Sequence, residues 1–196
     1  LVTDDDDLAA QAILLSGSYM LYRSHLARPA DAVFERWAPT TPNCSLRMSN
    51  LAAAIARPQL GATLRERAAR WNRRYQWVVR ALAGAPHLRV PQRDAREQFV
   101  ASSVQFLVEL PPAGVERFVA ASAARGVHVK WFGAAAPAGF TSAWHHWRYL
   151  GVPQELDRAP RLLARLCDLR LPLTLDEAAC VALAAQLRAA AAEAAA

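Results

Sequence analysis

One long stretch, residues 45–82, limits the fold of this chain more than any other part. Its apolar residues recur at steps of three or four, with one five-residue step across Pro58. They are Leu51, Ile55, Leu60, Leu64, Ala68, Trp71, Tyr75, Val78 and Leu82. This spacing is that of one face of an α-helix. Because proline lacks the backbone N–H that a helix needs, we expect either a kink at Pro58 or two helices in series.

The other side of this stretch is charged and mostly basic, with Arg65, Glu66, Arg70, Arg73 and Arg74. The whole chain has a formal net charge of +6, and Lys130 is its only lysine. Two interpretations stay open: a solvated surface biased toward arginine, or a surface that binds phosphate, nucleotide or nucleic acid. Nucleic acid has the least support, because the basic residues are spread along the chain and no nucleic-acid motif accompanies them.

The chain begins with a short acidic segment, Asp4 to Asp7. We expect Thr3 or Asp4 to cap a helix that has the next carboxylates in its first turn, where negative charge suits the helix dipole. A metal site is the weaker interpretation, because adjacent side chains on one turn point in different directions and no histidine joins them. The small and hydroxyl residues at 16–22 follow, either as a connector or as a loop that lines a pocket.

The second half predicts a small α/β unit. Residues 104–110 alternate between apolar and polar side chains, which is typical of a half-buried strand, and Pro111 ends them. Shorter strands are expected at 88–90 and 127–132, helices at 115–122 and 158–166, and a strand or turn at 169–172. The last helix follows a capping signature at 174–177 and should fade into an alanine-rich tail after Leu187.

Chemical motifs are sparse. No Ser lies in a nucleophile elbow, no glycine-rich phosphate loop is present, and adjacent His145 and His146 do not suit a shared metal ion. Lys130 lies between apolar residues and could form a Schiff base, sit on the surface of an edge strand, or bind a substrate anion.

The cysteine content and hydrophobicity of the chain predict its cellular compartment. Three cysteines without metal-like spacing indicate free thiols in a reducing compartment, hence the cytoplasm. No apolar run reaches the roughly 20 residues of a membrane helix, so we expect no membrane partner.

The sequence of the long stretch resembles that of a known family. Arg47-Met48-Ser49-Asn50-Leu51-Ala52-Ala53-Ala54-Ile55, then Gln59-Leu60, then a run of arginines ending in Tyr75, is similar to the helix that follows the cofactor-binding lysine in DegT/DnrJ/StrS-type aminotransferases. The acidic start, residues 104–110, residues 126–132 and the ending Leu171-Pro172-Leu173-Thr174-Leu175-Asp176-Glu177 resemble further segments of the family, in the same order.

The resemblance implies the C-terminal part of a fold-type I transferase that depends on pyridoxal 5'-phosphate. Residues 1–44 would end the large domain, residues 45–84 would form a long connecting helix, and residues 85–196 would form the small α/β domain. Such enzymes are usually homodimers with the active site at the interface. They move an amino group from an amino acid donor to a keto acceptor, often on a nucleotide-linked sugar.

The resemblance also assigns roles to single residues. Arg47 and Asn43 would contact the cofactor phosphate, although Asn43 stands four residues before Arg47 where the family pattern places it two before. Tyr19, Lys130, Trp131 and Phe132 would line the substrate site. The cofactor-binding lysine would lie upstream of residue 1, so no catalytic residue is assigned, and we expect this chain to be inactive alone. The alternative is a non-catalytic interaction module derived from such an enzyme.

Overall fold

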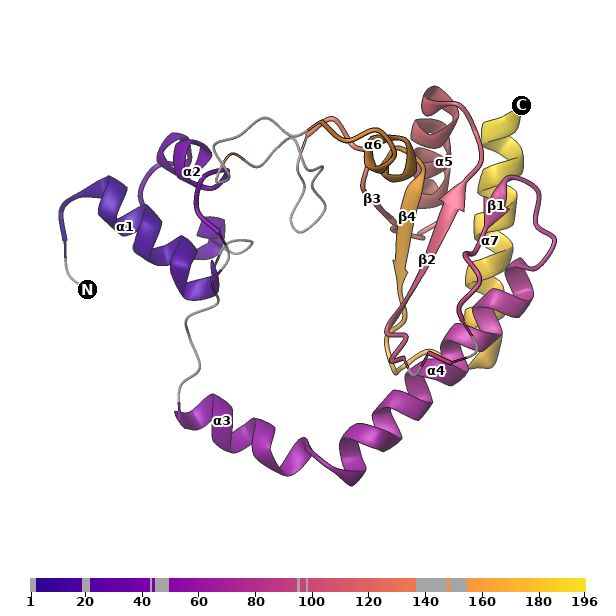
Figure 1. Cartoon of the computed structure of the whole chain (residues 1–196), viewed down its shortest axis with the longest axis horizontal. Helices are drawn as coiled ribbons and strands as arrows, with labels where there is room; N and C mark the ends of the chain where they lie inside the picture. Colours follow the sequence, from indigo (N-terminus) through magenta and orange to yellow (C-terminus); the bar gives the residue numbers. More distant parts are fainter. Residues whose placement is uncertain are drawn as a thin grey trace. The chain divides into compact units, whose positions relative to one another are not determined.

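The computed structural model describes residues 3–18, 22–42, 44, 50–94, 96, 97, 99–136, 148 and 155–196. The chain divides into two compact units. Unit 1 comprises Leu1–Ala56 and Ala135–Glu155, and unit 2 comprises Arg57–Ala134 and Leu156–Ala196. Figure 1 shows the elements of both units, coloured along the sequence. The division expected from the sequence, into residues 1–44, 45–84 and 85–196, refers to the domains of a complete family member. It stays a prediction.

Unit 1 begins with helix α1 (Asp6–Ile13), which continues into a π-helical turn (Leu14–Ser18). Its N-cap is Asp5, whose carboxylate accepts a hydrogen bond from the Leu8 N–H at 3.0 Å. The expectation that Thr3 or Asp4 caps this helix was therefore wrong. The Thr3 hydroxyl does not cap the helix but accepts a hydrogen bond from the Asp5 N–H at 3.1 Å.

The core of unit 1 forms between α1 and α2 (Asp31–Trp37), with a 3-10 turn (Tyr22–Ser24) beside them. The Tyr22 and Phe34 rings stack with their centroids 4.4 Å apart. The Trp37 indole N–H donates to the Asp7 carboxylate at 2.8 Å, and Arg36 pairs with the same carboxylate. Asp7 therefore joins the two helices. The fully or nearly buried residues are Ala10, Ile13, Leu14 and Phe34.

The long helical stretch is two helices in series. Helix α3 (Asn50–Ala56) is followed by a 3-10 turn (Arg57–Gln59) that contains Pro58, and α4 (Ala62–Leu82) begins after Gly61. This is one of the two outcomes expected from the missing proline N–H. Gly61 has a positive φ of 75°, a conformation that suits glycine at the break.

Unit 2 contains a four-stranded antiparallel sheet with the order β1-β2-β4-β3. The strands are β1 (Leu88–Arg89), β2 (Ser103–Val108), β3 (Lys130–Trp131) and β4 (Leu166–Arg170). The strand expected at 127–132 is shorter than predicted. The strand or turn expected at 169–172 is the end of β4, an interior strand of the sheet.

The helix expected at 158–166 is also shorter, because α6 spans only Ala159–Leu163. The helix ends early because the backbone that follows it pairs with β2 in the sheet. The Val108 N–H donates to the Arg165 carbonyl at 2.9 Å, and Leu107 pairs with Leu166. Ladder hydrogen bonds to β2 therefore replace the last turn of the expected helix.

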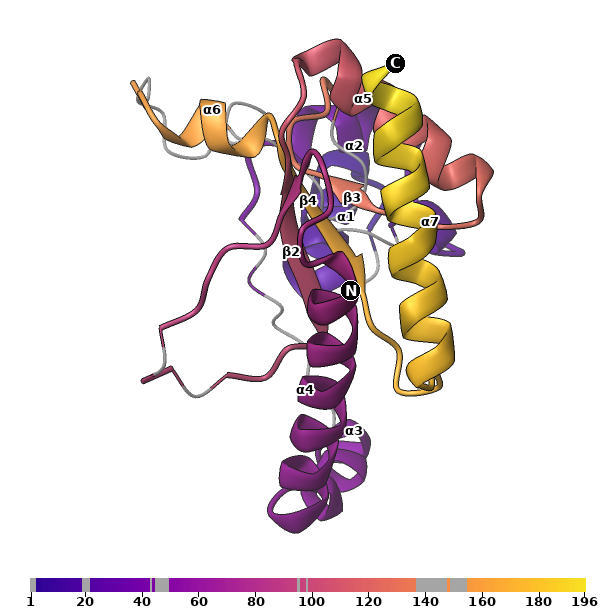
Figure 2. The same cartoon turned by 90° about the vertical axis from the view of Figure 1, so that its right-hand side faces the viewer.

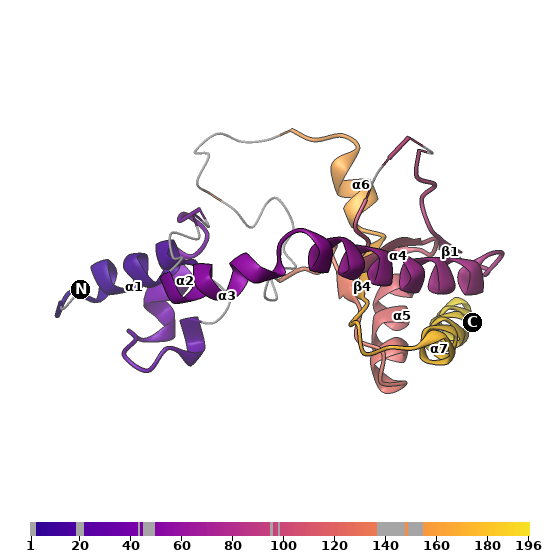
Figure 3. The same ribbon diagram turned by 90° about the horizontal axis from the view of Figure 1, so that it is seen from below.

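Three helices cover one face of the sheet: α4, α5 (Pro112–Ala124) and α7 (Glu177–Ala195). Figure 2 shows α5 and α7 on the same side of β2 and β4, and Figure 3 shows α4, α5 and α7 gathered together from another direction. The Phe106 and Phe118 rings meet edge to face at 6.0 Å. The strand residues that face these helices are Val104, Phe106, Val108, Cys167 and Leu169.

The last helix is longer than expected. Alanines 190, 191 and 194 are fully buried, so the alanine-rich end belongs to the core and is not a fading tail. By length and composition α7 is also apolar enough to cross a membrane, contrary to the expectation that no such run exists. The same composition suits a helix whose small side chains let it approach α4 and α5 closely.

Candidate functional site

The face of the sheet opposite α4, α5 and α7 holds the candidate site, and we call it the outer face. Because side chains alternate along a strand and paired residues share a face, Gln105, Asp168 and Lys130 lie in one row across β2, β4 and β3. Ser103 and Arg170 form the next row on one side. The row is therefore polar and charged, whereas the opposite face of the same strands is apolar.

Asp168 is the most buried member of this row, with 5% of its surface exposed. Its carboxylate Oδ2 lies 3.9 Å from Nε of Arg170, and its partner across the ladder is Lys130. A buried carboxylate is costly unless cations or hydrogen-bond donors compensate it. The row therefore places a shielded negative charge between two basic residues.

Cys167 lies next to Asp168 but points to the helices. Burial, and secondly the negative charge of Asp168, raise the pKa of the Cys167 thiol to about 12. Since the thiolate is the reactive form, this cysteine is unsuited to nucleophilic catalysis at neutral pH. Burial also raises the pKa of Cys180, so neither core thiol is a candidate nucleophile.

Trp131 and Lys130 occupy opposite faces of β3. Trp131 packs against the core of unit 2, and its indole N–H donates to the Ala164 carbonyl at 2.9 Å. Gly133 lies so close to this segment that an added Cβ would meet Cα of Ala164 at 2.6 Å. The polar atom of Trp131 is thus already used, and its side chain lies on the face opposite Lys130, so the two predicted substrate residues do not line one surface.

Phe132 returns to the side of Lys130. Its backbone N–H donates to the Leu166 carbonyl at 3.1 Å, which continues the β3–β4 ladder by one residue. Alternation then places the Phe132 side chain on the outer face. Lys130 and Phe132 therefore bring a cation and an apolar side chain to the same face.

The other predicted site residues lie outside the described part of the chain. These are Arg47 and Asn43 for the cofactor phosphate and Tyr19 for the substrate, and their roles stay predictions. His145 and His146 also lie outside it. Within the described residues, no group of three or more His, Cys, Asp or Glu side chains could hold a metal ion.

Sequence reasoning missed Asp168 and Gln105. The helix expected at 158–166 and the strand or turn expected at 169–172 leave Asp168 outside any predicted strand. The alternation of Cys167, Leu169 and Leu171 with Asp168 and Arg170 was the signal that could have found β4 and its outward carboxylate.

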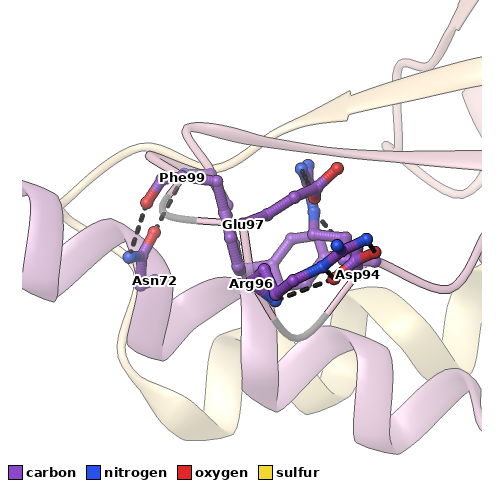
Figure 4. Close-up of polar contacts among 8 residues, drawn as sticks. Asn72, Asp94, Arg96, Glu97 and Phe99 are labelled. Carbon is purple, nitrogen blue, oxygen red and sulfur yellow. Dashed lines mark hydrogen bonds and ion pairs between the residues drawn. The ribbon is translucent and has the colours of Figure 1, made fainter.

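A hollow of about 330 Å³ lies elsewhere in unit 2, between α4 and the segment 90–99. Figure 4 shows how this segment is attached to α4. The Asn72 amide donates to the Phe99 carbonyl at 2.9 Å and accepts from the Ala101 N–H at 2.9 Å. The Arg93 guanidinium lies 4.2 Å from the centroid of Phe99, so it packs on an aromatic ring. The segment is therefore fixed to the helix by both polar and aromatic contacts.

Comparison with known proteins gives a consistent picture. The model of the DegT/DnrJ/EryC1/StrS aminotransferase family matches residues 1–187. No curated protein matches the chain. Among solved structures, the chain is similar to an aminotransferase, TlmJ from Streptoalloteichus hindustanus, with a TM-score of 0.58 and 17% sequence identity.

That structural match covers 97% of this chain and 46% of the TlmJ chain, so this chain spans about half the length of the solved structure. At this level of identity the likeness concerns the fold. The predicted fold class is confirmed: this is a mixed α/β chain that matches part of an aminotransferase of fold-type I.

Proposed function

Because this chain belongs to the DegT/DnrJ/EryC1/StrS aminotransferase family, we propose that it is the C-terminal part of an aminotransferase that uses pyridoxal 5'-phosphate. The observation on which the proposal rests is the family match over residues 1–187. Bound pyridoxal phosphate would supply the electron sink for amino transfer, and the protein would supply binding, orientation and electrostatics.

Lys130 is better suited to bind an anion than to bind this cofactor covalently. It is the only lysine in the chain, and a carboxylate, that of Asp168, is its ladder partner. An anion-binding lysine acts through its positive charge, and the register places Lys130 in a polar row opposite a carboxylate residue, not in the apolar surroundings typical of a Schiff-base lysine. We therefore place the cofactor-binding lysine outside residues 1–196, in the part of the enzyme that corresponds to the rest of the TlmJ chain.

In this proposal the outer face contributes a wall of the substrate site. Lys130 would bind a carboxylate of the amino donor or a phosphate of a nucleotide-linked acceptor, and Phe132 would contact an apolar part of the same molecule. Asp168 would keep the lysine oriented, and Gln105 would offer an amide to hydroxyl groups. Support comes from the shared row and from the side-chain alternation.

The test compares this chain alone with the chain joined to the large domain of a family member that bears the lysine. We expect no amino transfer from glutamate by residues 1–196 with added pyridoxal phosphate, and transfer by the joined protein. Robust turnover by residues 1–196 alone, or a folded joined protein that binds no cofactor, would contradict the proposal.

A second variant tests the role of Lys130 in the joined protein. Replacing Lys130 by alanine should raise KM for the anionic substrate about tenfold with little change in kcat, because one charge-assisted contact is lost from the bound state and the transition state alike. Arg158→Ala, which removes an exposed cation in unit 2, is the matched control. A loss of all kcat in Lys130→Ala would instead assign the lysine to the chemistry.

A further inference from the structure

The side of α4 that is not buried against the core has a groove, separate from the outer face of the sheet. Its volume is about 520 Å³, and its lining residues are Ala69, Asn72, Arg73, Gln76, Trp77 and Arg80. They form two rows along the helix with four-residue steps, 69, 73 and 77 in one row and 72, 76 and 80 in the other. All of them belong to unit 2. We call this surface the α4 groove.

The shape of the α4 groove suits a helix. Side chains four residues apart form ridges on a helix, and the space between two such ridges receives a ridge of a second helix when helices pack. The α4 groove is a space of this kind and is about 16 Å long, at a rise of about 1.5 Å per residue. One helix alone lines it, whereas sites for small molecules are usually enclosed on several sides. The geometry therefore favours an elongated partner.

Positive charge is concentrated on α4. Its 21 residues include six arginines and one carboxylate residue, Glu66. The formal net charge of the whole chain is +6, so most of it comes from this helix. Basic residues also occur elsewhere in the chain, but acidic residues there almost balance them. The composition of α4 therefore favours an acidic partner.

Two arginines of the groove are available to such a partner. Arg73 and Arg80 are exposed, and neither forms an ion pair within the described residues. Arg70 and Arg74 instead donate to the Leu173 carbonyl, and Arg74 is 8% exposed. Arg73 and Arg80 are seven residues apart in the sequence, which is about 10 Å along the helix axis. Two carboxylates with the same spacing on a second helix would match both guanidinium groups.

The groove is held in shape by its surroundings. The Asn72 side chain is fixed by the backbone of Phe99 and Ala101, as Figure 4 shows for Asn72 and Phe99. Trp77 packs on the core of unit 2, and the Arg74 guanidinium lies over its ring, 5.8 Å from the centroid. A preformed surface loses less side-chain entropy when a partner binds it. Because part of the indole is already covered, Trp77 suits contact with an apolar side chain better than stacking with a nucleic-acid base.

We propose that the α4 groove binds an acidic amphipathic helix of another protein. A ridge of the partner helix lies between the two rows of α4, two of its carboxylates pair with Arg73 and Arg80, and an apolar residue between them contacts Trp77. The contact depends on charge complementarity, so salt weakens it. It uses neither the outer face nor amino transfer, so its tests stand apart from those of the proposed function.

The first test measures the binding of a labelled model peptide to the protein by fluorescence anisotropy. The patterned peptide is an alanine-based helix of about 20 residues with two glutamates seven residues apart and a leucine between them on the same face. We expect saturable binding that weakens as the salt concentration rises. A scrambled peptide of the same composition, with its glutamates on opposite sides of the helix, should bind at least about tenfold more weakly. A single-stranded oligonucleotide of thymidines represents the other class of partner, nucleic acid, and should bind more weakly than the patterned peptide.

The second test changes the groove. Arg73→Glu/Arg80→Glu should weaken binding of the patterned peptide at least about tenfold, because like charges then face each other. The same variant should bind a peptide with lysines in place of the two glutamates, which the parent protein should not bind. Arg158→Glu/Arg161→Glu makes the same change in net charge on exposed residues outside α4 and should bind the patterned peptide as the parent does.

Circular dichroism shows whether each variant is folded, and Arg73→Gln/Arg80→Gln takes the place of the double glutamate variant if that one is not. Three results would each overturn the proposal: no binding of the patterned peptide to the parent protein, equal binding of the patterned and scrambled peptides, or equal binding of the patterned peptide by the parent and the groove variant. Tighter binding of the oligonucleotide than of the patterned peptide would also overturn it and would assign the groove to nucleic acid.

Discussion

Helix α3 and the C-terminal half of α4 have the same apolar periodicity and opposite environments. In α4, Tyr75, Val78 and Leu82 are at most 6% exposed, because the sheet and α7 cover them. In α3, Leu51 and Ile55 are 70% and 58% exposed. The comparison shows that a periodic pattern defines which side chains share a face, while burial depends on what packs against that face.

The break at Pro58 does not by itself explain this difference. Leu60 and Leu64 follow Pro58 and are still 64% and 48% exposed. Burial begins farther along, where α4 reaches the sheet of unit 2. The apolar residues before that point keep large exposed fractions, although they follow the same helical period.

The largest expected effect tests this comparison directly. Leu82→Ala should lower the free energy of unfolding by about 2–4 kcal/mol, since it leaves a cavity in the core of unit 2. Leu51→Ala, the same change on the exposed helix, should alter it by less than about 0.5 kcal/mol. Urea denaturation of both variants measures the difference. Equal losses would show that α3 is covered in solution.

A smaller effect concerns the polar anchor on α4. Asn72→Ala should lower the free energy of unfolding by about 1–2 kcal/mol, because the Phe99 carbonyl and the Ala101 N–H lose their partner. Hydrogen exchange at Ala101 should accelerate in the same variant. Gln76→Ala, one turn later and exposed, is the control. Unchanged exchange in Asn72→Ala would mean that Arg93 and the aromatic rings suffice to hold the segment.

The third effect depends on pH and tests how strongly Cys167 is buried in the core of unit 2. The pKa of Cys167 is raised from 9.0 to about 12, so the unfolded thiol ionises at a lower pH than the folded one. The stabilisation is complete below pH 9.0 and is lost as pH rises toward 12. By about pH 10 the loss should be about 1 kcal/mol. Cys167→Ala should remove this part of the alkaline slope, and an identical slope in both proteins would contradict it.

The smallest effect is local to the segment that packs on Tyr75. Two hydrogen bonds lower the pKa of Asp94 to about 2: the larger effect comes from the Arg96 side chain, and the smaller one from the Arg96 backbone N–H. Their stabilising effect is present above 3.8, the ordinary pKa, and is lost as pH falls toward 2. Carboxyl NMR should follow this titration directly. In Arg96→Ala the Asp94 pKa should return toward 3.8, whereas Arg89→Ala should leave it unchanged.

The site could be predicted only in part. The alternation at 104–110 indicated β2, and Lys130 stood out as the only lysine. Asp168 was not predicted as a site residue because the sequence at 158–170 is compatible with both helix and strand. Pairing with β2 makes residues 166–170 a strand. Non-local hydrogen bonds of this kind are absent from any local pattern.

Interactions between neighbouring residues were sufficient to predict the break at Pro58, the acidic first turn of α1 and a capping signature at 174–177 before α7, because each depends on a residue and its neighbours within one turn. The family resemblance was also readable from the order of short segments. The sheet order, the burial of the alanine-rich end of α7 and the row of Gln105, Asp168 and Lys130 required the folded chain. In the row, Gln105 and Lys130 pair with Asp168 from 63 and 38 positions away, and the other two features also depend on which distant surfaces of the chain meet.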